Sequence, residues 1–225
     1  MLGTLVNVAA VIAGSALGLL FHAKLPPRLG AIAFQGIGLF TLFLGFTMAA
    51  KTRNLLVLIF AIVLGAITGE LIDIEKHLTR LGNWLKRKLR LGGERFAEGM
   101  VTAFLLFCMG SMTVLGAIEE GLGGKPNLLL AKSVLDGFAS IALSATLGAG
   151  VVFSVIPLLV YQGGLTLLAG TLGGALSETV INEMSAAGGL LLIGLGINIL
   201  EIKKLKVLNM LPALLFAAVL AALFA

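Results

Sequence analysis

The sequence predicts an all-α protein: a polytopic transmembrane helix bundle of seven or eight spans, formed by a single membrane domain over residues 1–225. Two observations predict this fold class. Apolar residues make up 59% of the chain and charged residues only 12%, whereas a soluble domain carries about 25% charged residues. In addition, apolar stretches follow one another almost end to end, and their lengths are close to what a helix needs to cross a hydrocarbon core, about 20 residues. We therefore expect the lipid bilayer to be the main solvent of this chain.

Eight apolar runs are predicted to be spans. They cover residues 2–22, 29–49, 54–73, 99–118, 127–147, 150–170, 185–200 and 207–225. The first run has no positively charged leader and no small-residue cleavage site, so we interpret it as a span and not as a signal peptide. A tight turn at Gly148 and Gly150 joins the fifth and sixth runs. If one of these two runs is re-entrant, the count falls from eight to seven.

Basic residues predict the orientation of the spans. The net charge is +5, but Lys and Arg lie in short loops without interleaved aromatic residues, so we expect no nucleic acid partner. Cytoplasmic loops of membrane proteins are enriched in Lys and Arg. With the N-terminus outside, twelve basic residues lie inside and only Lys51, Arg53, Lys125 and Lys132 lie outside. The predicted topology is therefore N-out and C-out.

Residues 74–92 are the main polar stretch of the chain. Their apolar residues recur at three- and four-residue spacing, opposite basic residues that include Lys76, Arg80 and Arg87. This pattern predicts an amphipathic helix on the cytoplasmic leaflet. Its role is either to anchor the protein on anionic lipid or to act as a gate or regulatory element.

The chain matches itself at an offset of 127–129 residues, which indicates an internal repeat. Polar residues recur in the same order in three stretches, namely 7–16 over 136–145, 34–36 over 161–163, and 70–76 over 198–204. We predict repeat one over residues 1–97, a linker span over 98–126 and repeat two over 127–225, so that spans 1–3 correspond to spans 5–7. With eight full crossings the two repeats are parallel, whereas a re-entrant segment would make them inverted.

Short phrases spread over the whole chain carry a family resemblance. The most specific are Phe107-Cys108-Met109-Gly110 and Tyr161-Gln162-Gly163, and further ones are Thr52-Arg53-Asn54 and Lys132-Ser133-Val134-Leu135-Asp136-Gly137. They resemble the bacterial membrane family known as domain of unknown function 554, the YqgA and YdfK type. The resemblance implies a compact, multi-pass protein of the bacterial inner (plasma) membrane. It implies no substrate and no activity.

Asp136 is the strongest candidate for a functional residue. It lies about ten residues into the fifth run, and Lys132, Asp136, Ser140 and Ser144 follow in steps of four, so they share one helix face. A charge at this depth costs several kcal/mol unless it is paired or meets water. One hypothesis is a structural Lys132–Asp136 ion pair with serines bonded to the backbone. The other is a water-lined pathway, with Asn7 on a weaker copy of the stripe in the first span.

Gln35 and Gln162 each lie near the middle of a span and are followed by glycine. Glycine weakens a helix, and freed backbone carbonyls at such breaks hold substrates and ions in many transporters. The competing hypothesis is close packing with an amide hydrogen bond between helices. Tyr161, beside Gln162, and Ser111 in the fourth span complete the candidate contacts for a substrate or ion.

Four further polar residues lie near the predicted cytoplasmic ends of their spans: Glu70, Asp73, Asn198 and Glu201. One interpretation is that they meet interfacial water or neighbouring lysines. The other is that they form an inner gate or coupling site for an ion or a proton.

The leading functional hypothesis is a membrane transporter of a small solute or ion, with coupling to a cation or a proton as an option and its site at the interface of the two repeats. The alternatives are an uncoupled ion channel and a non-transporting scaffold or lipid-binding protein. The expected partners are the lipid bilayer and a small solute or cation, with a homo-oligomer as a further option.

We expect neither an enzyme nor a metal site. The sequence has no His-Glu-x-x-His and no Gly-x-Ser-x-Gly motif. Neither His22 nor His77 has a second imidazole or thiolate at metal-ligand spacing. No cofactor is therefore predicted.

Overall fold

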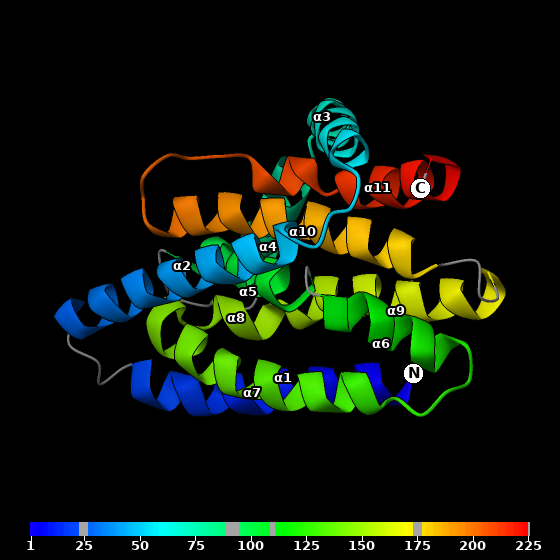
Figure 1. Cartoon of the computed structure of the whole chain (residues 1–225). Coiled ribbons are helices and arrows are strands. Elements are labelled where there is room, and N and C mark those ends of the chain that lie inside the picture. Colours follow the sequence, from blue (N-terminus) through cyan, green and yellow to red (C-terminus); the bar gives the residue numbers. More distant parts are fainter. Residues whose placement is uncertain (23–26, 89–94, 109–110, 173–176, 225) are drawn as a thin grey trace. The chain divides into compact units, whose positions relative to one another are not determined.

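The structure is a computed structural model that describes residues 1–22, 27–88, 95–108, 111–172 and 177–224. The regular structure of these residues is helical, without strands (Figure 1), which confirms the predicted fold class. The elements are α1 (Leu2–His22), α2 (Pro27–Ala49), α3 (Leu55–Ile72), α4 (Ile74–Lys88), α5 (Phe96–Cys108), α6 (Ser111–Gly121), α7 (Asn127–Leu147), α8 (Gly150–Phe153), α9 (Val155–Leu172), α10 (Glu178–Ile199), the 3₁₀ helix η1 (Val207–Met210) and α11 (Ala213–Phe224).

Where the structure describes it, each predicted apolar run is largely helical. Among the described residues, six segments are long and apolar enough to cross a membrane, or up to seven if the bent pair α5 and α6 counts as one span. The described apolar part of α2, Gln35–Ala49, is shorter than a span. One boundary differs from the prediction, because α10 begins at Glu178 and not near residue 185. Ser177 caps its first turn by accepting a hydrogen bond from the Val180 N–H.

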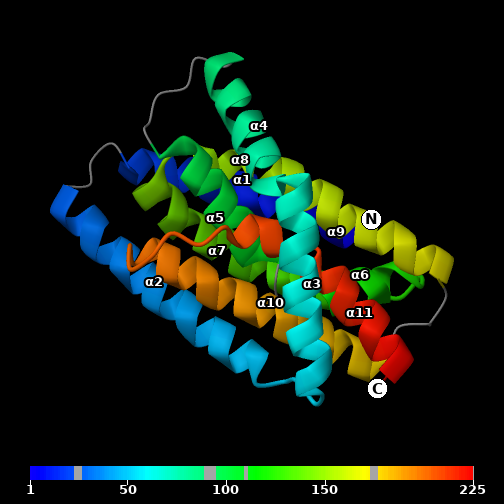
Figure 2. The same cartoon turned by 90° about the horizontal axis from the view of Figure 1, so that it is seen from above.

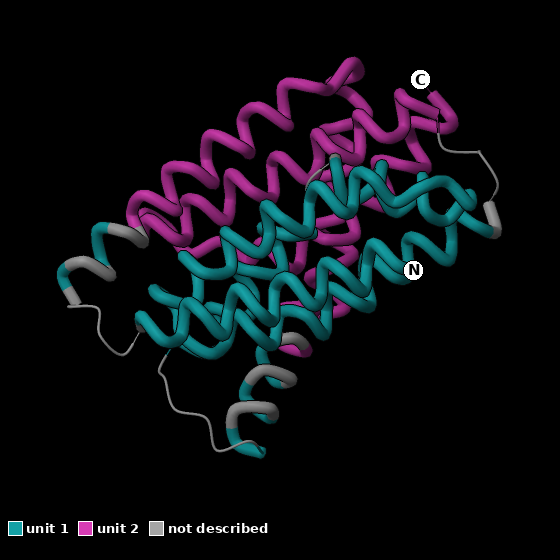
Figure 3. The backbone as a smooth tube through the Cα atoms, turned by 90° about the horizontal axis from the view of Figure 1, so that it is seen from below, with its two compact units in different colours: residues 1–34, 78–108, 112–173 teal, residues 35–77, 109–111, 174–225 magenta. Residues whose placement is uncertain are grey.

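The chain divides into two compact units (Figure 3). Unit 1 contains residues 1–34, 78–108 and 112–173, and unit 2 contains residues 35–77, 109–111 and 174–225. Each unit takes helices from both predicted repeats, so the units are not the repeats. The internal duplication stays a prediction.

In unit 1, α1 and α7 pack side by side in the same direction. A Cβ atom on Gly14 would lie 2.1 Å from the Gly137 carbonyl oxygen, and one on Gly18 would lie 2.3 Å from the Ile141 carbonyl oxygen. The two contacts keep the same sequence offset, so the helices run parallel. Small residues four apart allow two membrane helices to approach this closely.

We expect Gly14→Ala to destabilise unit 1, because the new methyl group would meet the α7 backbone, which cannot rotate away. The free energy of unfolding should fall by about 2 kcal/mol. The matched control is Gly164→Ala in α9, where a Cβ would meet nothing within 4 Å, so its better helix propensity should leave stability equal or higher. Thermal unfolding in detergent measures both variants. Equal melting temperatures would contradict the close approach of α1 and α7.

The bent pair α5 and α6 runs along α7 in the opposite direction. A Cβ on Gly99 of α5 would lie 3.1 Å from Leu147, and one on Gly116 of α6 would lie 2.8 Å from Leu129. The pair therefore passes from the C-terminal to the N-terminal end of α7, although α5 and α6 are bent by 65°. A re-entrant loop would return to its starting end, so this packing indicates a broken span.

In unit 2, the neighbouring helices run antiparallel. On α3, Gly65 lies against Ala213 and Gly69 lies against Asn209. On α2, from Gln35 onward, Gly38 lies against Leu200 and Gly45 against Ile193; α2 and α10 can be followed side by side in Figure 2. These directions, together with the parallel α1 and α7, are the ones that eight alternating crossings require.

The predicted amphipathic helix is present as α4, Ile74–Lys88. Its predicted end, residues 89–92, lies outside the described residues. Near the end of α4 the Lys88 ammonium lies 4.6 Å from the centre of the exposed Trp84 ring. An aromatic ring beside basic side chains is typical of a helix at the lipid headgroups. Attachment of α4 to the cytoplasmic leaflet stays a prediction.

Candidate functional site

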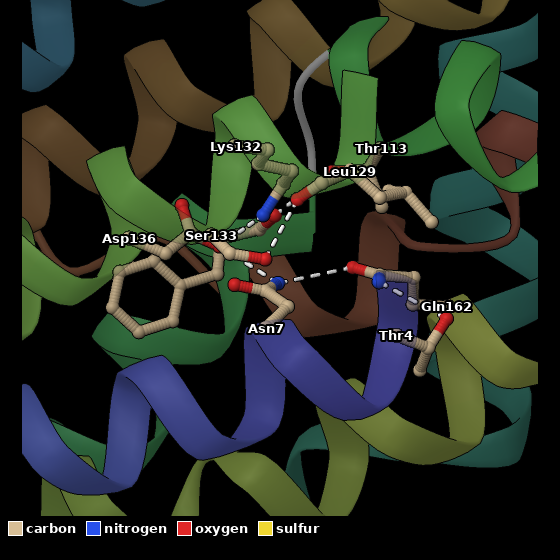
Figure 4. Close-up of polar contacts among 9 residues, drawn as sticks. Thr4, Asn7, Thr113, Leu129, Lys132, Ser133, Asp136 and Gln162 are labelled. Carbon is tan, nitrogen blue, oxygen red and sulfur yellow. Dashed lines mark hydrogen bonds and ion pairs between the residues drawn. The ribbon is translucent and has the colours of Figure 1, made fainter. Parts of the chain in front are cut away.

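A cluster of buried polar side chains lies within unit 1, and Figure 4 shows its contacts. We call Thr4 and Asn7 of α1, Lys132 and Asp136 of α7, and Gln162 of α9 the Asp136 cluster. Thr4, Asn7 and Gln162 are fully buried, while Lys132 and Asp136 are 5% and 7% exposed. An ion pair and three polar side chains are thus enclosed within apolar helices.

Asn7 bridges the cluster. Its Nδ2 donates to Asp136 Oδ2 at 3.0 Å and to Gln162 Oε1 at 3.2 Å. Gln162 Nε2 in turn donates to Thr4 Oγ1 at 3.2 Å. The Lys132 ammonium donates to Asp136 Oδ2 and forms an ion pair with it. Three helices, α1, α7 and α9, are therefore connected through one carboxylate and two amides.

Local helix geometry places these side chains. Lys132 and Asp136 are one turn apart on α7 and face the same side. Asp136 is the tenth residue of the 21-residue helix α7, so it lies near the middle of a span. Parallel packing at Gly14 and Gly18 brings Asn7 of α1 opposite it.

The cluster is neutral but not fully satisfied. The charges of Lys132 and Asp136 cancel, and the Lys132 Nζ lies 5.9 Å from the centre of the Phe107 ring. The Asn7 amide uses both N–H donors, yet its carbonyl oxygen Oδ1 is buried without a partner. An unsatisfied buried acceptor costs about 1–3 kcal/mol, so a further cation or donor at this oxygen would be stabilising.

The structure brings some of the predicted site residues together. Asn7, Asp136 and Gln162 are in direct contact. Ser140 donates to the Gly137 carbonyl oxygen at 2.7 Å, whereas the Ser144 hydroxyl is buried and unpartnered. Tyr161 is not part of the cluster, and its ring packs edge-on against Phe104 with centroids 6.2 Å apart.

Two other candidates lie elsewhere. Gln35 is exposed on the part of α2 that belongs to unit 2, and the Ser111 side chain lies outside the described residues. The hypothesis of broken helices after the glutamines is wrong, because α2 continues through Gly36 and α9 continues through Gly163. Glycine costs a helix only about 0.5–1 kcal/mol, which is less than unpaired backbone groups cost in lipid.

The predicted gate candidates Glu70 and Asp73 lie at the end of α3. Glu70 accepts a hydrogen bond from Asn209 Nδ2 at 2.7 Å and pairs with Lys206. The hydrogen bond to the Glu70 carboxylate raises the pKa of Lys206. Asp73 pairs with Lys76 at 3.7 Å. Both acids thus contact neighbouring lysines, as the first of the two interpretations of these residues expects.

Asn198 and Glu201 have matching places at the end of α10. Asn198 donates to the Leu205 carbonyl oxygen at 2.8 Å and accepts from the Leu205 N–H at 2.7 Å, so it closes the turn that follows α10. Among the described non-glycine residues, only Asp73 and Glu201 have a positive φ, which is 57° at both. Such residues are uncommon. Asp73 and Glu201 are aligned in the predicted duplication, which stays a prediction.

Sequence reasoning missed Glu183 of α10, which is fully buried in unit 2. Its Oε1 accepts from the backbone N–H groups of Arg53 and Asn54 at 2.6 and 3.1 Å, and its Oε2 accepts from Thr52 Oγ1 at 2.7 Å. Asn54 in turn caps α3. An acidic residue beside a 16-residue apolar run was the available signal, but the span was predicted to start after it. Thr4, Lys206 and Asn209 were also missed, and a single polar residue in an apolar stretch gives little signal.

Comparison with known proteins finds relatives over nearly the whole chain. Residues 2–222 match the family described as protein of unknown function (DUF554). Over 225 residues the chain is 35% identical to the uncharacterized membrane protein YdfK of Bacillus subtilis (strain 168), covering 97% of this chain and 95% of that protein. Over 227 residues it is 34% identical to the uncharacterized protein YqgA of Escherichia coli (strain K12), covering 99% and 97%. No solved structure matches.

Proposed function

Because this chain belongs to the DUF554 family of proteins of unknown function, we propose a function from its own residues: it transports a small solute or ion across the bacterial inner membrane, coupled to a cation or a proton. The family resemblance carried by the short phrases is confirmed. The assignment of transport rests on the Asp136 cluster.

The observation that carries the proposal is an ion pair buried at the middle of a span. Taking two charges out of water costs so much that a buried pair adds little net stability. Ionisable residues inside a membrane are therefore rare, and they typically mark ion or proton pathways. Asp136 and Lys132 are 7% and 5% exposed.

The connections of the carboxylate also fit a coupling centre. Asp136 lies on the fifth predicted span and its partner Asn7 lies on the first. These two residues are aligned in the predicted duplication, so their contact is an interface between the two predicted repeats. Rocking of one repeat against the other is a common mechanism of alternating access. Such a movement would alter the hydrogen bonds around Asp136.

Protonation or cation binding at Asp136 would change the same contacts. A neutralised carboxylate no longer attracts the Lys132 ammonium, and it accepts more weakly from Asn7. The contacts that join α1, α7 and α9 therefore depend on the charge of one group. This dependence is what coupling of an ion to a conformational change requires.

Reconstitution into proteoliposomes tests the proposal. Uptake should be measured over a panel of monovalent cations and amino acids, with and without a proton gradient. We expect a solute whose accumulation requires a proton or cation gradient. Flux that only dissipates a gradient would indicate the uncoupled channel, and no flux for any solute or ion would favour the non-transporting scaffold.

A further inference from the structure

The Lys132 ammonium occupies a position suited to a free cation. It contacts the Asp136 carboxylate, and the Phe107 ring lies at 5.9 Å from it. Asn7, which binds the same carboxylate oxygen as the ammonium, has a buried carbonyl oxygen without a partner. Figure 4 shows the side chains of Asn7, Lys132 and Asp136 converging on this point. An anion and an aromatic face thus border one positive charge, and the amide that shares this anion carries an unused oxygen.

We infer that Lys132 is a tethered cation that occupies a binding site for a monovalent alkali cation on Asp136, and that the ammonium and the free cation bind there in turn. The role of this cation site rests on the proposed transport function, but binding of the cation can be measured without measuring transport. Oxygen atoms are the preferred ligands of hard cations. The Asp136 carboxylate supplies them here, and rotation of the Asn7 amide, which now donates to this carboxylate, would add its unpartnered carbonyl oxygen.

The position of Lys132 on α7 gives its side chain a second place to go. It is the sixth residue of α7, so its Cα lies about 8 Å from the start of the helix at 1.5 Å per residue. Helix side chains lean toward the N-terminus, and long lysine stems extend to the membrane interface when they can. Pairing with Asp136 pulls Lys132 the other way. Loss of this pairing would therefore let the ammonium move toward the interface.

Charge balance selects a monovalent ion. With Lys132 paired, the site is neutral, and exchange of its ammonium for one alkali cation keeps it neutral. A divalent cation would leave one uncompensated positive charge in a buried, low-dielectric site, which is costly. An alkali cation that binds while the Lys132 ammonium stays in place would also leave one uncompensated positive charge. The ammonium and the alkali cation should therefore exclude each other.

The test is removal of Lys132 from the full-length protein in detergent. The melting temperature of Lys132→Met should be measured in NaCl, KCl and LiCl against choline chloride at equal ionic strength. A bound ligand stabilises the folded state, so one of the three salts should raise the melting temperature of this variant by roughly 5 °C at a hundredfold excess over Kd. The unsubstituted protein should change by less than about 1 °C.

Two controls separate the site from general effects of charge. Lys125→Met removes an exposed lysine just before the same helix and should respond like the unsubstituted protein. The double variant Lys132→Met with Asp136→Asn should lose the cation response. An equal response of the single and double variants, or no response to any of the three cations, would overturn the inference.

Two further outcomes are decisive. If Lys132→Met does not fold, Lys132→Gln serves as a second variant, because it keeps a donor for Asp136 without a charge. Alkali salts should then raise the melting temperature of Lys132→Gln. Failure of both variants to fold in all three salts means that a free cation cannot replace the ammonium. If Lys132→Met responds to a cation but the protein shows no flux in proteoliposomes, the cation site is supported and transport is rejected. If the protein shows flux but Lys132→Met does not respond to any cation, transport is supported and the cation site is rejected.

Discussion

Asp136→Asn is expected to reduce coupled flux in proteoliposomes to the level of empty vesicles, while the protein remains inserted and folded. Asparagine keeps the size of the side chain and can still hydrogen bond to Asn7, but it cannot carry a charge or bind a proton at physiological pH. Coupling requires a group whose charge changes inside the membrane. Glu98→Gln, at an exposed acid of α5, is the matched control and should transport normally.

The structural hypothesis for the same residue predicts a different result. If Asp136 serves only to pair with Lys132, then Asp136→Asn strands a buried ammonium, and the free energy of unfolding should fall by about 3 kcal/mol. The double variant Lys132→Met with Asp136→Asn should then recover the melting temperature, since no unpaired charge remains. Flux and melting temperature should be measured on both variants. A double variant that is stable and transports normally would reject the functional role of Asp136.

Glu183→Ala is expected to destabilise unit 2 more than the other substitutions considered for their stability. The change leaves the backbone N–H groups of Arg53 and Asn54 and the Thr52 hydroxyl without their acceptor. Hydrogen bonds to a charged group contribute about 1.5–3 kcal/mol each, and the cost of burying the carboxylate offsets part of their sum. We expect a loss of about 4 kcal/mol, measured as a lower melting temperature in detergent.

Two variants calibrate this result. Glu178→Ala removes an exposed acid from the first turn of the same helix and should change stability by less than about 1 kcal/mol. Glu183→Gln keeps one acceptor oxygen but turns an N–H₂ group toward the donors, so it should fall between the two. Equal melting temperatures for Glu183→Ala and Glu178→Ala would mean that the loop from Thr52 to Asn54 does not depend on this carboxylate.

Part of the site could be predicted because a membrane sequence makes charge conspicuous. The sequence alone identifies Asp136 and Lys132, four residues apart, as candidates, and Asn7 is a candidate because it aligns with Asp136 in the predicted repeats. The partner of Gln162 did not follow, because its contact with Thr4 depends on where α9 crosses α1. Glu183 was missed because the boundary of α10 was predicted from hydropathy, whereas the Ser177 cap begins the helix earlier.

The sequence by itself determined that this protein is a bundle of membrane helices and where most of them lie, because partition into lipid depends on the composition of about 20 consecutive residues. Tertiary structure alone decided which polar residues meet. In apolar helices nearly every face is compatible with lipid, so the pattern of a span does not specify its neighbour. The close approach at Gly14 and Gly18 specifies it for α1 and α7. That approach brings Asn7 to Asp136, and no local property of either helix contains this information.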